Sequence, residues 1–312
     1  MRAHLKALPG RADRIQRDRP WLAFPVAVWK KFGDDQAGNL AALVAYYAFV
    51  SIFPLLLVLV TVLQIVLRHD PALRERLVRS ALHAYPVIGP QLSSNVHALS
   101  STGIALVIGL VGAMLGARGV AVAMQNALNS VWAVPPDERP AFPWSTIRAI
   151  ALVIVVGLGQ LLAALLSGVA GGLGHLISGP AAEAGTVLLS FVANIGVFWL
   201  AFRLATAAKV SWRDLRLAAV LSAASWQLLL LLGGYIIGHL LHHSSAIYGV
   251  FGVVLGLLAW LYLQAQITLY AVEAATVRAW HLWPRGIAPP PTGQDVRAYD
   301  YYARAQRRAP QA

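Results

Sequence analysis

The sequence contains no cysteine and few charged residues. Without cysteine the chain forms no disulfide, no thiolate metal site and no cysteine nucleophile. Only 12% of the 312 residues are charged and 58% are apolar, whereas about 25% of the residues in an average soluble domain are charged. These proportions exclude a water-soluble fold and indicate a chain that is solvated mainly by lipid.

Acidic residues are the scarcer of the two charged types, with 13 Asp and Glu against 25 Lys and Arg. A ribonuclease or another hydrolase needs a His-rich metal motif with a nearby Asp, paired carboxylates, or a nucleophile on a soluble domain. The sequence has none of these, and no histidine lies beside Asp34 and Asp35. We therefore expect a protein that is not an enzyme and holds no cofactor. Few carboxylates within the apolar runs also argue against a proton or sodium relay.

Six apolar runs are long enough to cross a membrane as helices. A hydrocarbon core of ~30 Å requires about 20 residues at ~1.5 Å each. The predicted helices cover residues 40–67, 103–125, 149–176, 184–202, 217–238 and 246–272. The sequence therefore predicts an all-α integral membrane protein, a bundle of six transmembrane helices.

The basic residues are distributed unevenly over the segments between these runs. The segment before the first run has 8 Lys and Arg, the second-to-third connection 3 when Arg118 near the end of the second run is counted, the fourth-to-fifth 4 and the C-terminal segment 6. On the opposite side, the first-to-second connection has 4. Because basic residues resist translocation, both termini are expected in the cytoplasm. The net charge of +12 then reflects topology, and no nucleic-acid partner is expected.

Three regions follow from this topology. Residues 1–39 form a basic cytoplasmic juxtamembrane segment, 40–273 the transmembrane domain, and 274–312, with its run of three prolines at 289–291, a flexible cytoplasmic tail. The largest outer connection, residues 68–102, has a helical apolar stripe that predicts a short amphipathic helix on the outer surface.

Membrane lipids are the first expected partners. Basic residues near a membrane surface attract anionic lipid by roughly 1 kcal/mol each. Those of the first segment are Arg11, Arg14, Arg17, Arg19, Lys30 and Lys31.

The first apolar run carries a candidate binding feature. Pro54 lies near its middle. Because proline has no N–H, the carbonyl of Val50 is left without its helical hydrogen bond, and the hydroxyl of Ser51, one turn from Pro54, is expected to donate to it. Kinked spans often line substrate cavities in transporters, and Tyr46 and Tyr47 offer hydroxyl groups to a ligand. Packing within the bundle is the alternative interpretation.

Three charged residues form a second candidate site. Arg118 interrupts the second run about 22 Å along its helix, close to the expected cytoplasmic interface, and an intramembrane charge is a functional hypothesis by default. Glu273 ends the sixth run and Arg203 the fourth, both on that side. Two cations and one anion leave one positive charge unpaired, so we predict a cluster that could bind a phosphate. The alternative is that these side chains are simply solvated at the interface.

Histidines and glycines at helical spacing suggest further contacts. His239, His242 and His243 have i, i+3, i+4 spacing, which suits zinc. No carboxylate or cysteine accompanies them, so they are weak metal candidates, and a pH-responsive patch is the alternative. Gly112 and Gly116 have the small-residue spacing that lets membrane helices pack closely.

Three stretches of the chain resemble the YihY/BrkB family. They are Ala45-Tyr46-Tyr47 with Ser51-Ile52-Phe53-Pro54-Leu55-Leu56, then Asn126-Ala127-Leu128-Asn129-Ser130-Val131-Trp132, and Tyr248-Gly249 through Trp260-Leu261-Tyr262 to Tyr270-Ala271-Val272-Glu273. The similarity covers about residues 25–280, and the combined order is more specific than any one piece. Ala271 departs from the family pattern, which more often has glycine there.

The resemblance implies a six-helix bacterial inner-membrane protein, from a family once labelled ribonuclease BN and elsewhere a serum-resistance factor, with no settled biochemical activity. Relatives are associated with envelope lipid and lipopolysaccharide. Two functions stay open. One is a transporter-like protein that handles or translocates a lipid or another amphiphilic anion for the cell envelope. The other is a non-enzymatic scaffold that docks an envelope protein or forms a homo-oligomer.

Overall fold

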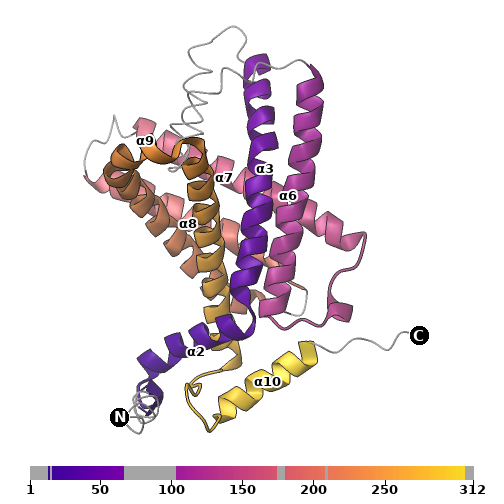
Figure 1. Ribbon diagram of the computed structural model, residues 1–312, viewed down its shortest axis with the longest axis vertical. Coiled ribbons are helices and arrows are strands. Elements are labelled where there is room, and N and C mark those ends of the chain that lie inside the picture. Colours follow the sequence, from indigo (N-terminus) through magenta and orange to yellow (C-terminus); the bar gives the residue numbers. More distant parts are fainter. Residues whose placement is uncertain (1–12, 15, 67–102, 174–179, 208–209, 306–312) are drawn as a thin grey trace. The chain divides into compact units, whose positions relative to one another are not determined.

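The computed structural model describes residues 13–14, 16–66, 103–173, 180–207 and 210–305, and the regular elements in these ranges are helices (Figure 1). They are Pro20–Asp34 (α2), Ala37–Val66 (α3), Gly103–Val131 (α6), the 3-10 helix Pro136–Glu138 (η2), Trp144–Leu173 (α7), Pro180–Ala205 (α8), Trp212–Trp280 (α9) and Gly293–Ala305 (α10). The expectation of an all-α protein is confirmed for the described residues.

Five stretches within these helices are long and apolar enough to cross a membrane. They are Ala37–Leu55, Val107–Val131, Trp144–Leu162, Val187–Ala205 and Val254–Trp280. Each overlaps one of the six predicted helices. The sixth, over residues 217–238, extends into a part of α9 whose side chains lie outside the described set, so the count of six stays a prediction.

Helix α9 must reverse its direction between its two ends. Its 69 residues would span on the order of 100 Å if they were straight, several times the thickness of a bilayer core. Leu221, near its start, packs against the same apolar cluster as Ala274 and Val277, near its end. The sequence predicted two separate helices here, and the return of the chain within α9 agrees with two passes.

Residues with left-handed backbone conformations end three of the helices. Gln36 follows α2 with φ 50°, Ala133 follows α6 with φ 44°, and His281 follows α9 with φ 54°. After α9 the amide of Leu282 donates to the carbonyl of Val277 at 3.0 Å, the hydrogen bond of a Schellman motif. These stops fix where α2, α6 and α9 present their last side chains.

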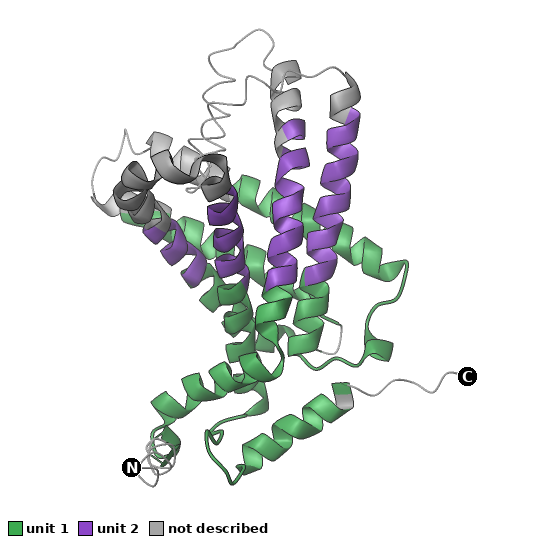
Figure 2. Cartoon of the chain, in the orientation of Figure 1, with its two compact units in different colours: residues 1–41, 124–224, 266–312 green, residues 42–123, 225–265 purple. Residues whose placement is uncertain are grey.

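The chain divides into two compact units (Figure 2). Unit 1 comprises residues 1–41, 124–224 and 266–312, and unit 2 comprises residues 42–123 and 225–265. In unit 1, α2, both ends of α9 and α10 share one apolar cluster. Its buried members are Ala27, Val28, Ala274, Val277, Leu282 and Ala298.

Helices α7 and α8 of unit 1 also pack closely. A Cβ atom added at Gly159 would lie 2.5 Å from a methyl group of Val197. The side-chain amide of Gln160, the next residue on α7, donates at 3.3 Å to Asn194, which lies one turn before Val197 on α8. A small residue and an interhelical hydrogen bond are the usual means by which helices associate in lipid.

In unit 2, α3 and α6 run side by side (Figure 1). A Cβ atom added at Gly112 would lie 2.9 Å from Pro54, and one added at Gly116 would lie 2.5 Å from the hydroxyl of Ser51. The sequence interpretation of Gly112 and Gly116 as packing residues is confirmed.

Candidate functional site

Helix α2 brings a lysine to a buried position beside the last candidate span. Pro20 starts this helix at its first position, where the missing proline N–H costs nothing. Lys31 lies eleven residues later and is completely buried. Since long basic side chains are almost never fully buried without a partner, its contacts decide what this region can do.

The Lys31 ammonium group uses all three of its donors. It contacts the carboxylates of Asp35 at 2.5 Å and Glu273 at 2.8 Å, and it donates to the carbonyl oxygen of Val131 at 2.8 Å. The side chain of Asp35 is 5% exposed and that of Glu273 is 0% exposed. We call Lys31, Asp35 and Glu273 the lysine cluster.

The charges around Lys31 keep it protonated. Burial alone would lower the pKa of Lys31, but the negative charges of Glu273 and Asp35 outweigh that effect and raise the pKa above its usual value. The ammonium also lies 5.6 Å from the ring centroid of Trp280, within the reach of a cation–π interaction. The lysine cluster therefore contains one permanent cation and two carboxyl groups.

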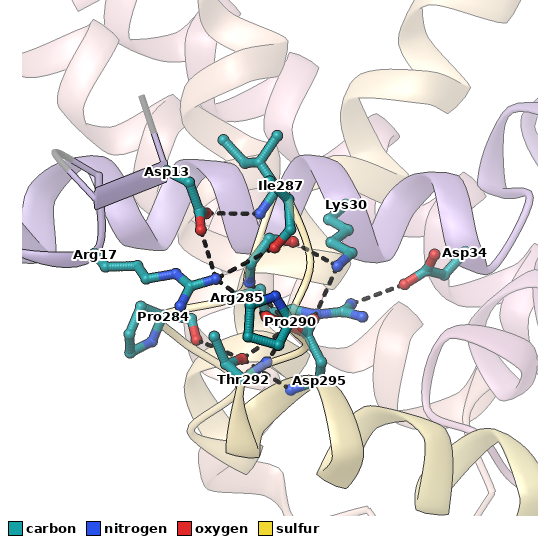
Figure 3. Close-up of polar contacts among 12 residues, drawn as sticks. Asp13, Arg17, Lys30, Asp34, Pro284, Arg285, Ile287, Pro290, Thr292 and Asp295 are labelled. Atoms are coloured by element: carbon teal, nitrogen blue, oxygen red, sulfur yellow. Dashed lines mark hydrogen bonds and ion pairs between the residues drawn. The ribbon is translucent and has the colours of Figure 1, made fainter. Parts of the chain in front are cut away.

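A second group of buried charges joins the segment before α10 to α2 (Figure 3). The carboxylate of Asp295, 1% exposed, accepts from Lys30 at 2.9 Å and from Arg285 at 2.9 Å. Its other oxygen accepts from the backbone amides of Gly286 and Thr292, both at 2.9 Å, and from the Thr292 hydroxyl. We call Asp295 and these donors the aspartate cluster.

The Asp295 carboxylate is held in its ionised form by its neighbours. Burial would raise the pKa of Asp295, but the hydrogen bonds from Thr292, Lys30, Gly286 and Arg285 outweigh it and hold the pKa well below its usual range. The Arg285 side chain is 0% exposed and also lies 2.8 Å from Asp34. The charges on Asp34 and Asp295 raise the pKa of Arg285 despite its burial.

The N-terminal segment reaches the same loop through Asp13. Asp13 accepts a hydrogen bond from the backbone amide of Ile287 at 2.8 Å and pairs with Arg17 at 2.5 Å (Figure 3). Burial opposes ionisation of Asp13, but the contacts with Ile287, Gln16 and Arg17 lower its pKa. Segments that are about 270 residues apart in sequence are thus joined by charged groups.

Sequence reasoning found only Glu273 among these residues. Lys30, Lys31 and Arg17 were expected to face anionic lipid, and this is wrong for Lys31, which is buried against two carboxylates. The spacing of Lys31 and Asp35 at i, i+4 was the available signal. The prediction of a flexible tail after residue 273 also missed α10 and the buried Arg285 and Asp295.

Two members of the predicted anion site, Glu273 and Arg203, have other partners within unit 1. Glu273 takes Lys31 as its cationic partner, and the guanidinium of Arg203 lies 5.4 Å from the centroid of the Trp212 ring. Arg118 is exposed and belongs to α6 of unit 2. The candidate span Val107–Val131 continues past Arg118, which lies near the middle of that stretch, and its position relative to the membrane interface stays a prediction.

The candidates on α3 are mainly packing residues. Ser51 donates to the carbonyl of Tyr47 at 2.6 Å, and not to the freed carbonyl of Val50 as predicted. Tyr47 and Pro54 face Gly119 and Gly112 of α6. Tyr46 is 56% exposed and meets Tyr47 edge to face at 5.4 Å.

Two predictions concern parts that the structure leaves undescribed. The amphipathic outer helix falls within residues 67–102, outside the described ranges. His239, His242 and His243 belong to α9, but their side chains are outside the described set. Among the described residues, no group of three or more His, Asp or Glu side chains is arranged to hold a metal ion.

Together, the apolar helices and their buried charges define a helical integral membrane protein. The family described as virulence factor BrkB matches residues 28–290, so the chain belongs to the BrkB family, as its motifs indicated. It is 22% identical over 294 residues to the inner membrane protein YhjD of Escherichia coli (strain K12), over 85% of this chain and 83% of that protein. No solved structure matches the chain.

Proposed function

We propose that this BrkB-family protein is a transporter-like, non-enzymatic protein of the bacterial inner membrane that binds and translocates an anionic lipid or a similar amphiphilic anion. In this proposal the chain crosses the membrane six times and has both termini in the cytoplasm. The uneven distribution of Lys and Arg supports the topology, and the likeness to an inner membrane protein supports the location.

The observation that carries the proposal is the setting of Arg118. It is exposed on α6, in line with the exposed apolar residues that precede it by one, two and three turns. These residues are Val107, Val111, Met114 and Leu115, which are 51% to 67% exposed.

This stripe has the dimensions of a lipid. Arg118 lies eleven residues after Val107, so the stripe covers about 16 Å of helix at ~1.5 Å per residue, which is about half of a ~30 Å hydrocarbon core. A lipid whose acyl chains lie along the stripe would place its headgroup at Arg118. A guanidinium pairs well with a phosphate oxygen pair, so an anionic phospholipid fits both the apolar surface and the charge.

Native mass spectrometry tests this binding. The protein is purified in a mild detergent as wild type, Arg118→Ala and Arg216→Ala, the last as a matched control because Arg216 is also exposed but lies outside this stripe. We expect an anionic lipid that is retained by wild type and Arg216→Ala and lost from Arg118→Ala. Equal retention by all three variants would contradict the proposal.

A second assay separates binding from translocation. Proteoliposomes carrying a fluorescent anionic lipid report its movement between leaflets, and Arg118→Ala is expected to slow that movement at least tenfold relative to Arg216→Ala. If no lipid is retained and none moves, the alternative of a membrane scaffold for envelope proteins is favoured. Residues 68–102 would then be the first region to mutate.

A further inference from the structure

The lysine cluster has a charge imbalance, whereas the two cations Lys30 and Arg285 of the aspartate cluster face two carboxylates, Asp295 and Asp34. It contains two carboxyl groups, Asp35 and Glu273, and the single cation Lys31, all with side chains no more than 5% exposed. If both carboxyl groups were ionised, the site would carry one uncompensated negative charge away from water. Such a charge is costly, and proteins commonly remove it by taking up a proton.

One oxygen atom of this cluster also has no partner. Glu273 Oε2 contacts Lys31, but Glu273 Oε1 is buried and has no hydrogen-bond partner. Lys31 has no donor left for it, because its other contacts are Asp35 and the Val131 carbonyl. A buried carboxylate oxygen without a donor is exceptional, whereas a carboxylic acid would itself be a donor.

Within the described part of the chain, the ion pairs of Asp35 and Glu273 are both with Lys31 and no second cation joins them. Asp35 lies close enough to Glu273 for their side chains to share a hydrogen bond. From α10, the Tyr302 hydroxyl is buried without a partner, and the charges that act on it come from Asp35, Asp34, Arg285 and Glu273. Arg285 is engaged by Asp34 and Asp295.

We propose that Asp35 and Glu273 form a proton-binding site, in which one proton is held between the two carboxyl groups beside Lys31. The proton comes from water and adds to one carboxylate oxygen, so the cluster changes from net −1 to neutral and no other covalent bond forms or breaks. The new O–H group donates to the facing carboxylate, and the orphaned oxygen of Glu273 gains its missing hydrogen bond. The site stands independently of the proposed lipid binding.

Its position gives the proton a structural effect. Glu273 belongs to the candidate span Val254–Trp280, while Asp35 directly follows α2. The proton therefore joins α9 to the end of α2 in addition to the ion pair between Lys31 and Glu273. Loss of the proton leaves two like charges facing each other across this contact.

Infrared difference spectroscopy detects the proton directly. The purified protein is titrated from about pH 4 to about pH 10, a range that includes the reference pKa values of carboxyl groups and approaches that of lysine. We expect a protonated-carboxyl band in the wild type that persists well above the reference carboxyl range and is absent from Glu273→Gln. Asp34→Asn is the matched control, since Asp34 is the adjacent acid but contacts Arg285, and it keeps the band. A wild type without this band, or a band unchanged in Glu273→Gln, overturns the proposal.

A stability comparison makes an independent test. The amide group that Glu273→Gln introduces would donate to Asp35 and accept from Lys31, as the protonated acid does. This variant is therefore expected to melt within a few degrees of the wild type and to lose its pH dependence. Asp35→Asn is expected to behave in the same way. If the cluster were a plain ion pair, both variants would be strongly destabilised, and failure of both to fold would likewise overturn the proposal.

Discussion

Two helix contacts, one in each compact unit, are held together by different means. In unit 1, α2, α9 and α10 are joined through buried charges, with Lys31 and Arg285 both fully enclosed. In unit 2, α3 and α6 are joined through a stripe of small residues, with Gly112 and Gly116 set directly against Pro54 and Ser51. The contact of α2, α9 and α10 in unit 1 thus depends on charge and donor balance, and the contact of α3 and α6 in unit 2 depends on side-chain volume.

This difference decides how each contact fails. Charges that are removed from water are stable only while every partner is in place, so loss of one partner leaves an uncompensated ion. Small residues let two helix backbones approach, and a single added methyl group separates them. The stability of the contact between α2, α9 and α10 should therefore depend on pH and on charge deletion. The stability of the contact between α3 and α6 should depend on added side-chain volume.

Asp295→Asn should have the largest effect on stability. The variant keeps the side-chain shape but leaves Lys30 and Arg285 without their shared anion, and breaking such buried pairs costs about 3–5 kcal/mol. The expected loss is measured as the free energy of unfolding in mixed micelles of mild detergent and dodecyl sulfate. Asp300→Asn, an exposed acid on the same helix, is the control and should change little.

Protonation of Asp295 should destabilise the aspartate cluster at low pH. Because the pKa of Asp295 is lower in the folded than in the unfolded protein, its contribution is fully present above about pH 4 and is lost as the pH falls further. Protease cleavage within residues 293–305 should increase in that range for the wild type. Equal protection at neutral and acid pH would show that Asp295 is not the anchor.

Lys31→Met should have the next largest effect. It removes the one cation that faces Asp35 and Glu273, at a cost of about 3 kcal/mol, the low end for a broken buried pair, because protonation of the carboxyl groups can partly replace the cation. The loss should therefore be greater at alkaline than at mildly acid pH. Unfolding in mixed micelles at several pH values checks both the size and the direction.

The pH response of the wild type follows from the raised pKa of Lys31. Its contribution is fully present below about pH 10, the reference pKa of lysine, and is lost as the pH rises through the higher folded value. The difference in stability between the wild type and Lys31→Met isolates this contribution, and its disappearance below about pH 9 would contradict the raised pKa of Lys31.

Gly116→Ala tests the packing in unit 2. The added Cβ atom would lie 2.5 Å from the Ser51 hydroxyl and 2.9 Å from its Cα atom, so the helices must separate, at a cost of about 1–3 kcal/mol. Gly157→Ala is the matched control, since its Cβ atom would meet nothing within 4 Å. If Gly116→Ala unfolds like Gly157→Ala, the close approach of α3 and α6 does not stabilise unit 2.

The fold was largely readable from the sequence because lipid imposes simple rules. A span needs about 20 apolar residues, and the predicted helices over 103–125 and 184–202 fall inside α6 and α8. The spacing of Gly112 and Gly116 likewise identified a helix contact. The continuity of α9 across the expected gap at 239–245 was not readable, because that short stretch is a polar interruption between two apolar runs.

Only part of the lysine cluster could be predicted from the sequence. A lone carboxylate at the end of an apolar helix requires a cation, and that rule identified Glu273. It did not identify Lys31, since the partner lies 242 residues away in sequence and is one of several basic residues in the same segment. The aspartate cluster was missed because the proline-rich sequence around residue 290 suggested an extended linker.

Ser51→Ala should have the smallest effect on the free energy of unfolding. The Ser51 hydroxyl donates to a carbonyl of its own helix at 2.6 Å, a bond that contributes little to helix stability. The free energy of unfolding of the variant should therefore lie within about 0.5 kcal/mol of that of the wild type.

Ser51→Ala also makes room at the point where Gly116 approaches, so Ser51→Ala combined with Gly116→Ala should recover part of the stability lost in Gly116→Ala alone. Recovery would establish that volume is the property of Ser51 that matters, whereas a loss of lipid retention at unchanged stability would restore Ser51 as a ligand contact.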